Sequence, residues 1–194
     1  MKLKLMGLIP FLSLAMSCSL TAQVKPEKQT ANPSQPQTQT STATQQPNFD
    51  PTAPYAKDPH IPVFSMISAA DGTEITNKTI PSNFKYTCII IFSPDCSHCQ
   101  HEAEELNKNA DKFKNVLFIW DSYREMEGIK KFATTYNLIG KPNIVIGRDP
   151  AFTIPTFYRP KMTPFVALYE NGNFVRVWDQ GVEVAELMKF IGAK

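Results

Sequence analysis

The stretch IIIFSPDCSHCQHEAEEL, residues 89–106, constrains the fold more than any other part of the chain. Its apolar start is typical of a strand that is covered on both faces of a sheet. Ser93-Pro94-Asp95 interrupts this strand, and apolar residues then recur every three or four positions, which predicts a helix that begins near Cys96. Two cysteines, Cys96 and Cys99, therefore lie at the start of a helix that follows a buried strand.

Strands and helices alternate along the chain from residue 61. We expect strands at 61–68, 87–92, 115–120, 143–146, 164–169 and 174–178, and further helices at 126–136 and 184–191. The last two strands flank Asn171-Gly172, the strongest hairpin signal in the chain. Strands that alternate with helices predict a parallel sheet, to which the hairpin adds an antiparallel edge. The sequence therefore predicts one α/β domain at residues 61–194.

Residues 1–60 differ in composition from this domain. Residues 1–17 carry Lys2 and Lys4 ahead of a short apolar run, which predicts a secretory signal peptide. Residues 18–60 are rich in Gln, Thr, Ser and Pro without apolar periodicity, so we expect a disordered tether. The junction LAMSC resembles a bacterial lipoprotein box, which implies that Cys18 is lipidated; secretion without a lipid is the alternative.

Export of the domain changes its charge and its chemical surroundings. The chain has 20 basic and 18 acidic residues, and removal of Lys2 and Lys4 leaves 18 of each. A chain without an excess of basic residues lacks the electrostatic footprint of a nucleic-acid-binding protein, so that class is excluded. Export also places the thiols in an oxidising compartment, where disulfides form and persist.

The predicted position of Cys96 favours a reactive thiolate. A helix N-terminus offers unpaired backbone N–H groups and the positive end of the helix dipole, and both stabilise a negative sulfur. The imidazole of His98 can add positive charge nearby. Because side chains three positions apart share a helix face, Cys99 is expected to approach Cys96 from a deeper position on the core side.

These residues resemble the thioredoxin-like superfamily. The segment IIIFSPDCSHCQ is similar to its strand–loop–Cys-x-x-Cys–helix core, and TPFVALY at 163–169 is similar to its later proline-led strand. The resemblance covers residues 61–194 and implies a thioredoxin-like α/β fold, with a central mixed sheet and helices on both of its faces. It also implies that the Thr163–Pro164 bond is cis, faces the cysteines, and presents backbone to an extended partner segment.

The subfamily features point to exported thiol–disulfide proteins of the TlpA and ResA type. Those proteins tend to combine an N-terminal membrane anchor with a threonine before the proline, where this chain has Thr163. Some also carry a glutamate three residues after the second cysteine, where Glu102 stands. Thioredoxins proper have a buried aspartate six residues before the first cysteine, where this chain has Ile90. We therefore predict that Glu102 is the general base for Cys99; the alternative is a solvated residue.

These features predict an enzyme, an exported protein thiol–disulfide oxidoreductase that needs no cofactor. The Cys96 thiolate attacks a partner disulfide, and Cys99 resolves the resulting mixed disulfide. The resemblance implies exported cysteine-containing proteins and a membrane redox partner as partners, and the periplasm or cell envelope of a bacterium as the location. The direction of electron flow is left open, because potentials in this fold run from about −270 to −120 mV.

Other functions use the same residues. Copper could bind to a cluster of four side chains, Cys96, His98, Cys99 and His101. Metal sites built on comparable motifs also use a ligand distant in the sequence, but no Cys or His follows His101 in this chain. We therefore predict no metal site. A disulfide-stapled binding module without enzymatic activity is a further alternative, although a staple across so short a loop constrains the unfolded chain little.

Two features of the chain have no assigned part in this chemistry. Cys88 lies in the apolar run and is predicted to be a buried, inert thiol. The segment 147–162 is longer than a minimal thioredoxin needs and is a candidate for an insertion that shapes specificity.

Overall fold

Strands β3 (Tyr86–Ile91) and β4 (Val116–Ser122) form the centre of the fold, and every residue in both is buried. In the computed structural model, which describes residues 49–193, they belong to a seven-stranded sheet in the order β2-β1-β5-β4-β3-β6-β7. The other strands are β1 (Ser65–Ser68), β2 (Glu74–Thr76), β5 (Ile144–Arg148), β6 (Phe165–Glu170) and β7 (Asn173–Trp178). The predicted signal peptide, Cys18 and most of the predicted tether lie outside the described residues.

The sheet is mixed, as the sequence predicts. Strand β4 pairs in parallel with both β3 and β5. Strand β6 pairs antiparallel with β3, and β7 then pairs antiparallel with β6. Asn171 and Gly172 in the β6–β7 turn have φ values of 50° and 79°, and the favoured two-residue hairpin turn requires positive φ at both positions. The predicted parallel core with a hairpin at its edge is confirmed.

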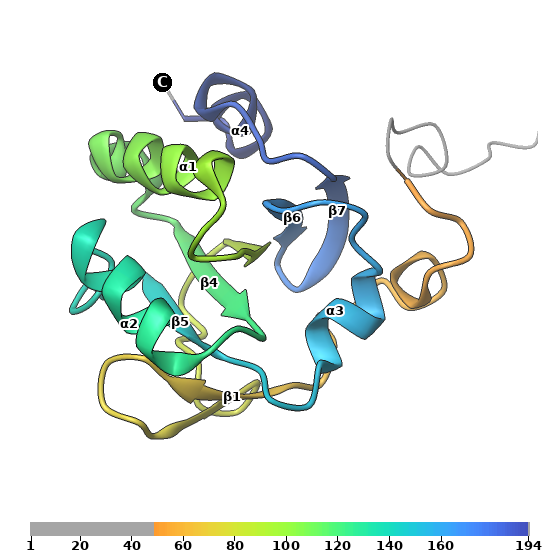
Figure 1. The fold of residues 1–194 in the computed structure, drawn as a ribbon. Coiled ribbons are helices and arrows are strands. Elements are labelled where there is room, and N and C mark those ends of the chain that lie inside the picture. Colours follow the sequence, from red (N-terminus) through yellow and green to blue (C-terminus); the bar gives the residue numbers. More distant parts are fainter. Residues whose placement is uncertain (1–48, 194) are drawn as a thin grey trace, which may run out of the picture. The chain divides into compact units, whose positions relative to one another are not determined.

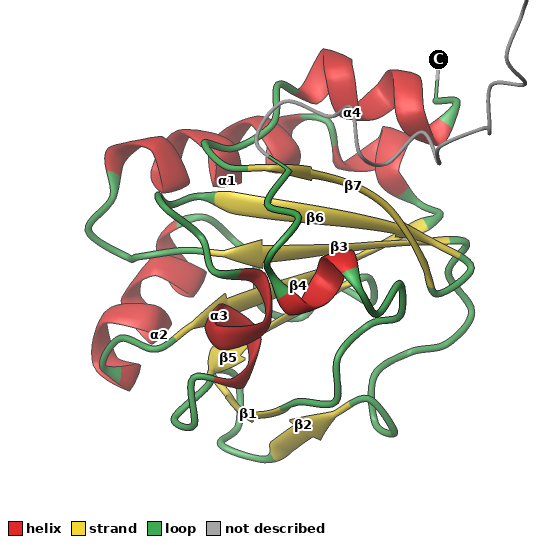
Figure 2. Cartoon of the chain, turned by 90° about the vertical axis from the view of Figure 1, so that its right-hand side faces the viewer, coloured by secondary structure: helices red, strands yellow, loops and turns green. Residues whose placement is uncertain are grey.

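Helices cover both faces of the sheet (Figure 1). Helices α1 (Ser97–Lys108), α2 (Met126–Thr135) and α4 (Val184–Ile191) bury their apolar residues in one core with the side chains of that face. Helix α3 (Thr153–Tyr158) lies on the opposite face, over a second core (Figure 2). The predicted fold class is confirmed. No helix within residues 49–193 is long and apolar enough to cross a membrane.

The folded domain starts earlier than the composition predicts. Residues 49–60 were expected to be part of the tether, yet Pro54–Ala56 forms a short 3-10 helix, and Ala53 and Tyr55 are buried in the second core. The ring of Tyr55 packs against Tyr158 of α3, with 5.8 Å between the ring centroids. The predicted boundary at residue 61 is therefore wrong, because a few aromatic residues anchor a segment that is otherwise polar.

Three predicted details of the chain also change. The first strand is confined to Ser65–Ser68 rather than 61–68, because Pro62 has no N–H to donate to a sheet. Strand β2 and helix α3 were not predicted, since three and six residues are too few to show a periodic pattern. Segment 147–162 contains α3, so it supplies part of the cover over the second face of the sheet.

Candidate active site

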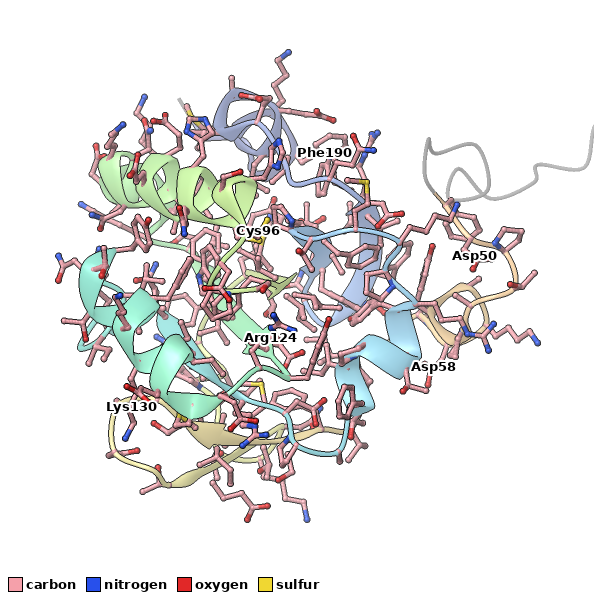
Figure 3. The ribbon with its side chains drawn as sticks, viewed as in Figure 1. Asp50, Asp58, Cys96, Arg124, Lys130 and Phe190 are labelled. Atoms are coloured by element: carbon pink, nitrogen blue, oxygen red, sulfur yellow. The ribbon has the colours of Figure 1, made fainter. Side chains whose placement is uncertain are left out.

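Cys96 caps the N-terminus of α1, where the chain leaves the carboxyl end of β3 (Figure 3). Its backbone is extended, with φ −85° and ψ 118°, and its Sγ accepts a hydrogen bond from the N–H of Cys99 at 3.4 Å. A sulfur in this position receives a donor that the first turn of a helix otherwise leaves unpaired. The predicted placement of Cys96 at the helix start is confirmed.

Strand β6, which neighbours β3 in the sheet, positions the other residues of the site. Strand β6 begins opposite the end of β3, with Phe165 paired to Ile91, so the two residues before β6 reach the cysteines. The Thr163–Pro164 peptide bond is cis, and the thiol of Cys96 donates to the backbone oxygen of Thr163 at 3.3 Å. The structure therefore places Cys96, Cys99, Thr163 and Pro164 together, as expected from the sequence.

The two thiols of this motif differ in their acidity. Partial burial opposes ionisation of Cys96, but its hydrogen bonds with Cys99, with Thr163 and with the His98 N–H outweigh burial and lower its pKa. Cys99 is fully buried, and burial together with the adjacent Cys96 raises its pKa to about 12. Cys96 is thus suited to attack, whereas Cys99 needs a group that removes its proton.

Glu102 is buried one helical turn beyond Cys99, on the same face of α1. Its side chain is 8% exposed, so the alternative of a solvated helix residue is wrong. Oε2 accepts the Val182 N–H at 3.1 Å, and Oε1 has no hydrogen-bond partner among the described residues. Burial raises the pKa of Glu102 to about 8, although the Val182 hydrogen bond acts in the opposite direction.

A groove of about 740 Å³ runs beside Glu102, between α1 and the segment that leads into α4. His101, Glu102 and Glu105 line it from α1, and residues 182–185 and Met188 line it from the other side. Glu102 therefore borders a groove that is lined by α1 and by the segment leading into α4.

The two histidines of the motif are exposed. The His98 N–H contributes to the lowered pKa of Cys96, and the predicted effect of its imidazole charge stays a prediction. Within residues 49–193 there is no cluster of three or more His, Cys, Asp or Glu side chains arranged to hold a metal ion. Cys88 is fully buried, and burial raises its pKa, as predicted for an inert thiol.

Within residues 49–193, sequence reasoning missed three further buried carboxyl groups, those of Asp149, Asp179 and, near the end of β4, Asp121. Asp121 is fully buried on the α3 side of the sheet, and neither side-chain oxygen has a hydrogen-bond partner among residues 49–193. Burial and then the nearby Asp149 raise its pKa well above the usual value. An aspartate directly after an apolar run predicts that the strand has ended. The pairing of Asp121 with Ile91 shows instead that Asp121 lies inside the sheet.

Comparisons with known proteins identify the fold. No protein-family model and no curated protein sequence matches the chain. Among solved structures, a secreted Mycobacterium tuberculosis disulfide oxidoreductase homologous to E. coli DsbE matches with a TM-score of 0.55 and 19% identity, over 66% of this chain and 94% of that one. A thioredoxin-like protein from Aeropyrum pernix matches with a TM-score of 0.55 and 15% identity, over 67% and 88% of the two chains.

The fold is also shared with a protein of different chemistry. The copper-bound ScoI of Arabidopsis thaliana matches with a TM-score of 0.52 and 18% identity, over 66% of this chain and 93% of that one. These likenesses confirm the predicted thioredoxin-like fold. They place the chain on a fold used for redox chemistry, and the choice among its functions rests on the residues of the site.

Proposed function

We propose that this thioredoxin-like protein is a thiol–disulfide oxidoreductase that exchanges disulfides with partner proteins through Cys96 and Cys99. The observation that carries the proposal is the asymmetry of the two thiols. Cys96 has a lowered pKa and lies against Thr163 at the helix start, whereas Cys99 is buried with a raised pKa. An accessible nucleophile backed by a buried second thiol is what two-step disulfide exchange requires.

The first step is attack by the Cys96 thiolate on a partner disulfide. A bond forms between Cys96 and one partner sulfur, and the other partner sulfur leaves as a thiolate. Formation of this mixed disulfide removes the negative charge of Cys96, which is one of the causes that raise the pKa of Cys99. Cys99 is therefore easier to deprotonate in the intermediate than in the free protein.

The second step resolves the mixed disulfide. Glu102 takes the proton of Cys99, the resulting thiolate attacks Cys96, and the partner's sulfur departs as a thiolate. The partner disulfide is reduced to two thiols, and Cys96 and Cys99 are oxidised to a disulfide. The same steps in reverse oxidise a partner, so the reduction potential decides the direction.

The proposal includes the cellular setting expected from the sequence. Residues 1–17 would direct export to the periplasm or cell envelope of a bacterium, and Cys18 would carry the lipid that anchors the chain to the membrane. The partners would be exported proteins with cysteines and a membrane protein that supplies or removes electrons. Radiolabelled palmitate incorporation into wild type but not into Cys18→Ser is the expected result for the anchor.

The test of the redox function is the reduction potential of the Cys96–Cys99 pair. The full chain carrying Cys18→Ser is equilibrated in glutathione or dithiothreitol buffers, and free thiols are trapped and counted by mass spectrometry. We expect a reversible loss of two thiols with a single midpoint. Cys99→Ser is the control and should show no intramolecular couple.

Two other outcomes would contradict the proposal. If Cys96 and Cys99 stayed reduced or oxidised across all buffers, the pair would be structural rather than redox-active. If the thiols titrated only when copper was added, and Cys96→Ser abolished copper binding, metal handling would replace disulfide exchange as the function.

A further inference from the structure

The loop between β7 and α4 comes unusually close to the carboxyl group of Glu102. Gly181 in this loop has φ +82°, and a Cβ atom placed there would lie 2.6 Å from Oε2 of Glu102 and 2.9 Å from Cγ of Pro164. Real Cβ atoms do not approach other atoms so closely. The gap left by Gly181 is therefore filled by Glu102 on one side and by Pro164 on the other.

The next residue in the loop fixes the orientation of the carboxyl group. The N–H of Val182 donates to Oε2 at 3.1 Å, across 80 residues of sequence. Oε1 is left buried and without a hydrogen-bond partner among the described residues. One carboxyl oxygen is thus held by the loop, and the other is available to take or give a proton.

We propose that Gly181 is a positioning residue for Glu102: its missing side chain lets the β7–α4 loop close on α1, so that the Val182 N–H fixes the carboxyl group on the helix face that also carries Cys99. This inference rests on the proposed function for its consequence in disulfide exchange. The placement of the carboxyl group itself can be tested without any redox activity. Neither Gly181 nor Val182 belongs to the Cys-x-x-Cys motif or to the Thr163–Pro164 segment.

Other titratable groups share the surroundings of Glu102. Cys99 lies on the same face of α1. The charge of Glu102 contributes to the raised pKa of Cys88 in β3, and the charge of Glu183 contributes to the raised pKa of Glu102. His101 and Glu105 line the same groove. A substitution of Gly181 by alanine adds no charge and leaves all of these groups in the chain. A change in the pKa of Glu102 therefore indicates that its carboxyl group has moved.

The test compares Gly181→Ala with Gly172→Ala in the full chain carrying Cys18→Ser. Gly172 has nearly the same backbone, with φ +79°, but a Cβ there meets nothing within 4 Å. Both variants therefore carry the strain of an alanine at positive φ, and only Gly181→Ala intrudes on Glu102. The measurement is the titration of the Glu102 carboxyl group by ¹³C NMR, with its signal assigned by its loss in Glu102→Gln.

We expect the midpoint of Glu102 in Gly181→Ala to differ by about half a pH unit or more from that in wild type and Gly172→Ala. Either direction supports the proposal, because the carboxyl group must leave the Val182 N–H. The midpoint rises if the group stays enclosed and falls if it turns into the groove. Equal midpoints in all three proteins would overturn it.

A second variant covers the case in which Gly181→Ala does not fold. Glu102→Asp keeps the acid but is one methylene shorter, so it withdraws from Val182. We expect resolution of the mixed disulfide to slow by about tenfold or more in this variant, and a wild-type rate would overturn the proposal. If wild type itself showed no redox couple, the proposed function would fail while the NMR titration still decided the positioning of Glu102.

Discussion

Two of the buried carboxyl groups lie on opposite faces of the sheet, Glu102 on α1 and Asp121 on the face that carries α3. Both are nearly or fully enclosed, and burial raises the pKa of both. Glu102 accepts a backbone hydrogen bond, borders a groove and lies one turn from Cys99. Neither side-chain oxygen of Asp121 has a hydrogen-bond partner among the described residues, and the carboxyl group lies near Asp149 on the face away from α1.

The difference between the two faces teaches that a raised pKa does not by itself indicate catalysis. Perturbed groups gather at functional sites, but structural burial perturbs them as well. What distinguishes Glu102 is its place one helical turn from Cys99, a group with a proton to lose, and at the border of a groove. On these grounds we propose that the first face carries the chemistry, and we expect the second face to contribute to stability.

The largest expected effect is on the rate at which the mixed disulfide is resolved, which should depend on Glu102 and not on Asp121. Glu102→Gln should slow resolution of the mixed disulfide by about 100-fold at pH 7, the usual contribution of a positioned general base. Asp121→Asn should leave this rate within about twofold of wild type. Single-turnover kinetics with a disulfide peptide would measure both, and a comparable loss in Asp121→Asn would show that the faces are coupled.

The pH dependence of mixed-disulfide resolution provides a second comparison of Glu102 with Asp121. Because the pKa of Glu102 is raised to about 8 and its ionised form is the base, the resolving rate should rise as pH increases towards 8. Between pH 7 and pH 9 the gain is about tenfold, after which the rate levels off. A stopped-flow pH profile that kept this inflection in Glu102→Gln would assign it to another group.

The pH dependence of stability should show the cost of the Asp121 charge on the second face, in a variant that leaves Glu102, whose pKa is also raised, unchanged. The pKa of Asp121 is raised on folding, so the folded state binds a proton that the unfolded state releases above pH 3.8. Stability is therefore lost as pH rises towards the raised pKa. Asp121→Asn removes this loss and should be more stable than wild type at pH 8 by about 2 kcal/mol, with the difference vanishing near pH 4.

Urea denaturation at several pH values would measure this difference. Thr87→Ser, which keeps a hydroxyl on the buried strand β3, provides a control for a small change in the core without a titrating group. A pH-independent effect of Asp121→Asn would mean that packing, rather than charge, sets its contribution.

The smallest effect concerns a hydrogen bond on the second face. The hydroxyl groups of Tyr158 and Tyr169 lie 2.6 Å apart in the core. Tyr158→Phe leaves the Tyr169 hydroxyl without this partner and should cost about 1 kcal/mol of unfolding free energy. The resolving rate should stay at the wild-type value, and a slower rate would contradict the division between the faces.

The parts of the fold that the sequence predicts are those with strong local signals. The apolar runs of β3 and β4, the Asn171-Gly172 turn and the helix start at Cys96 each follow from neighbouring residues. The burial of Glu102 does not, because the loop that covers it lies 80 residues further along the chain. Without the position of that loop, the sequence of α1 is equally consistent with a buried Glu102 and with a solvent-exposed one.

Asp121 and Tyr55 escape prediction for a related reason. Asp121 follows an apolar run, and its place inside the buried strand β4 depends on pairing with Ile91 and Gly147 of the neighbouring strands. Tyr55 belongs to a polar, proline-rich segment whose order depends on aromatic contacts with Tyr158 and Phe174. In each case the deciding contact is made by a residue distant in the sequence.

The segment before residue 61 also protects an edge of the sheet. Strand β7 is the last in the strand order, and an unpaired edge strand is a template for pairing with another chain. The backbone oxygen of Pro59 accepts the Phe174 N–H at 2.7 Å, and His60 forms a bridge with Asn173. A fragment that began at residue 61 would expose these groups of β7 and become prone to edge-to-edge aggregation.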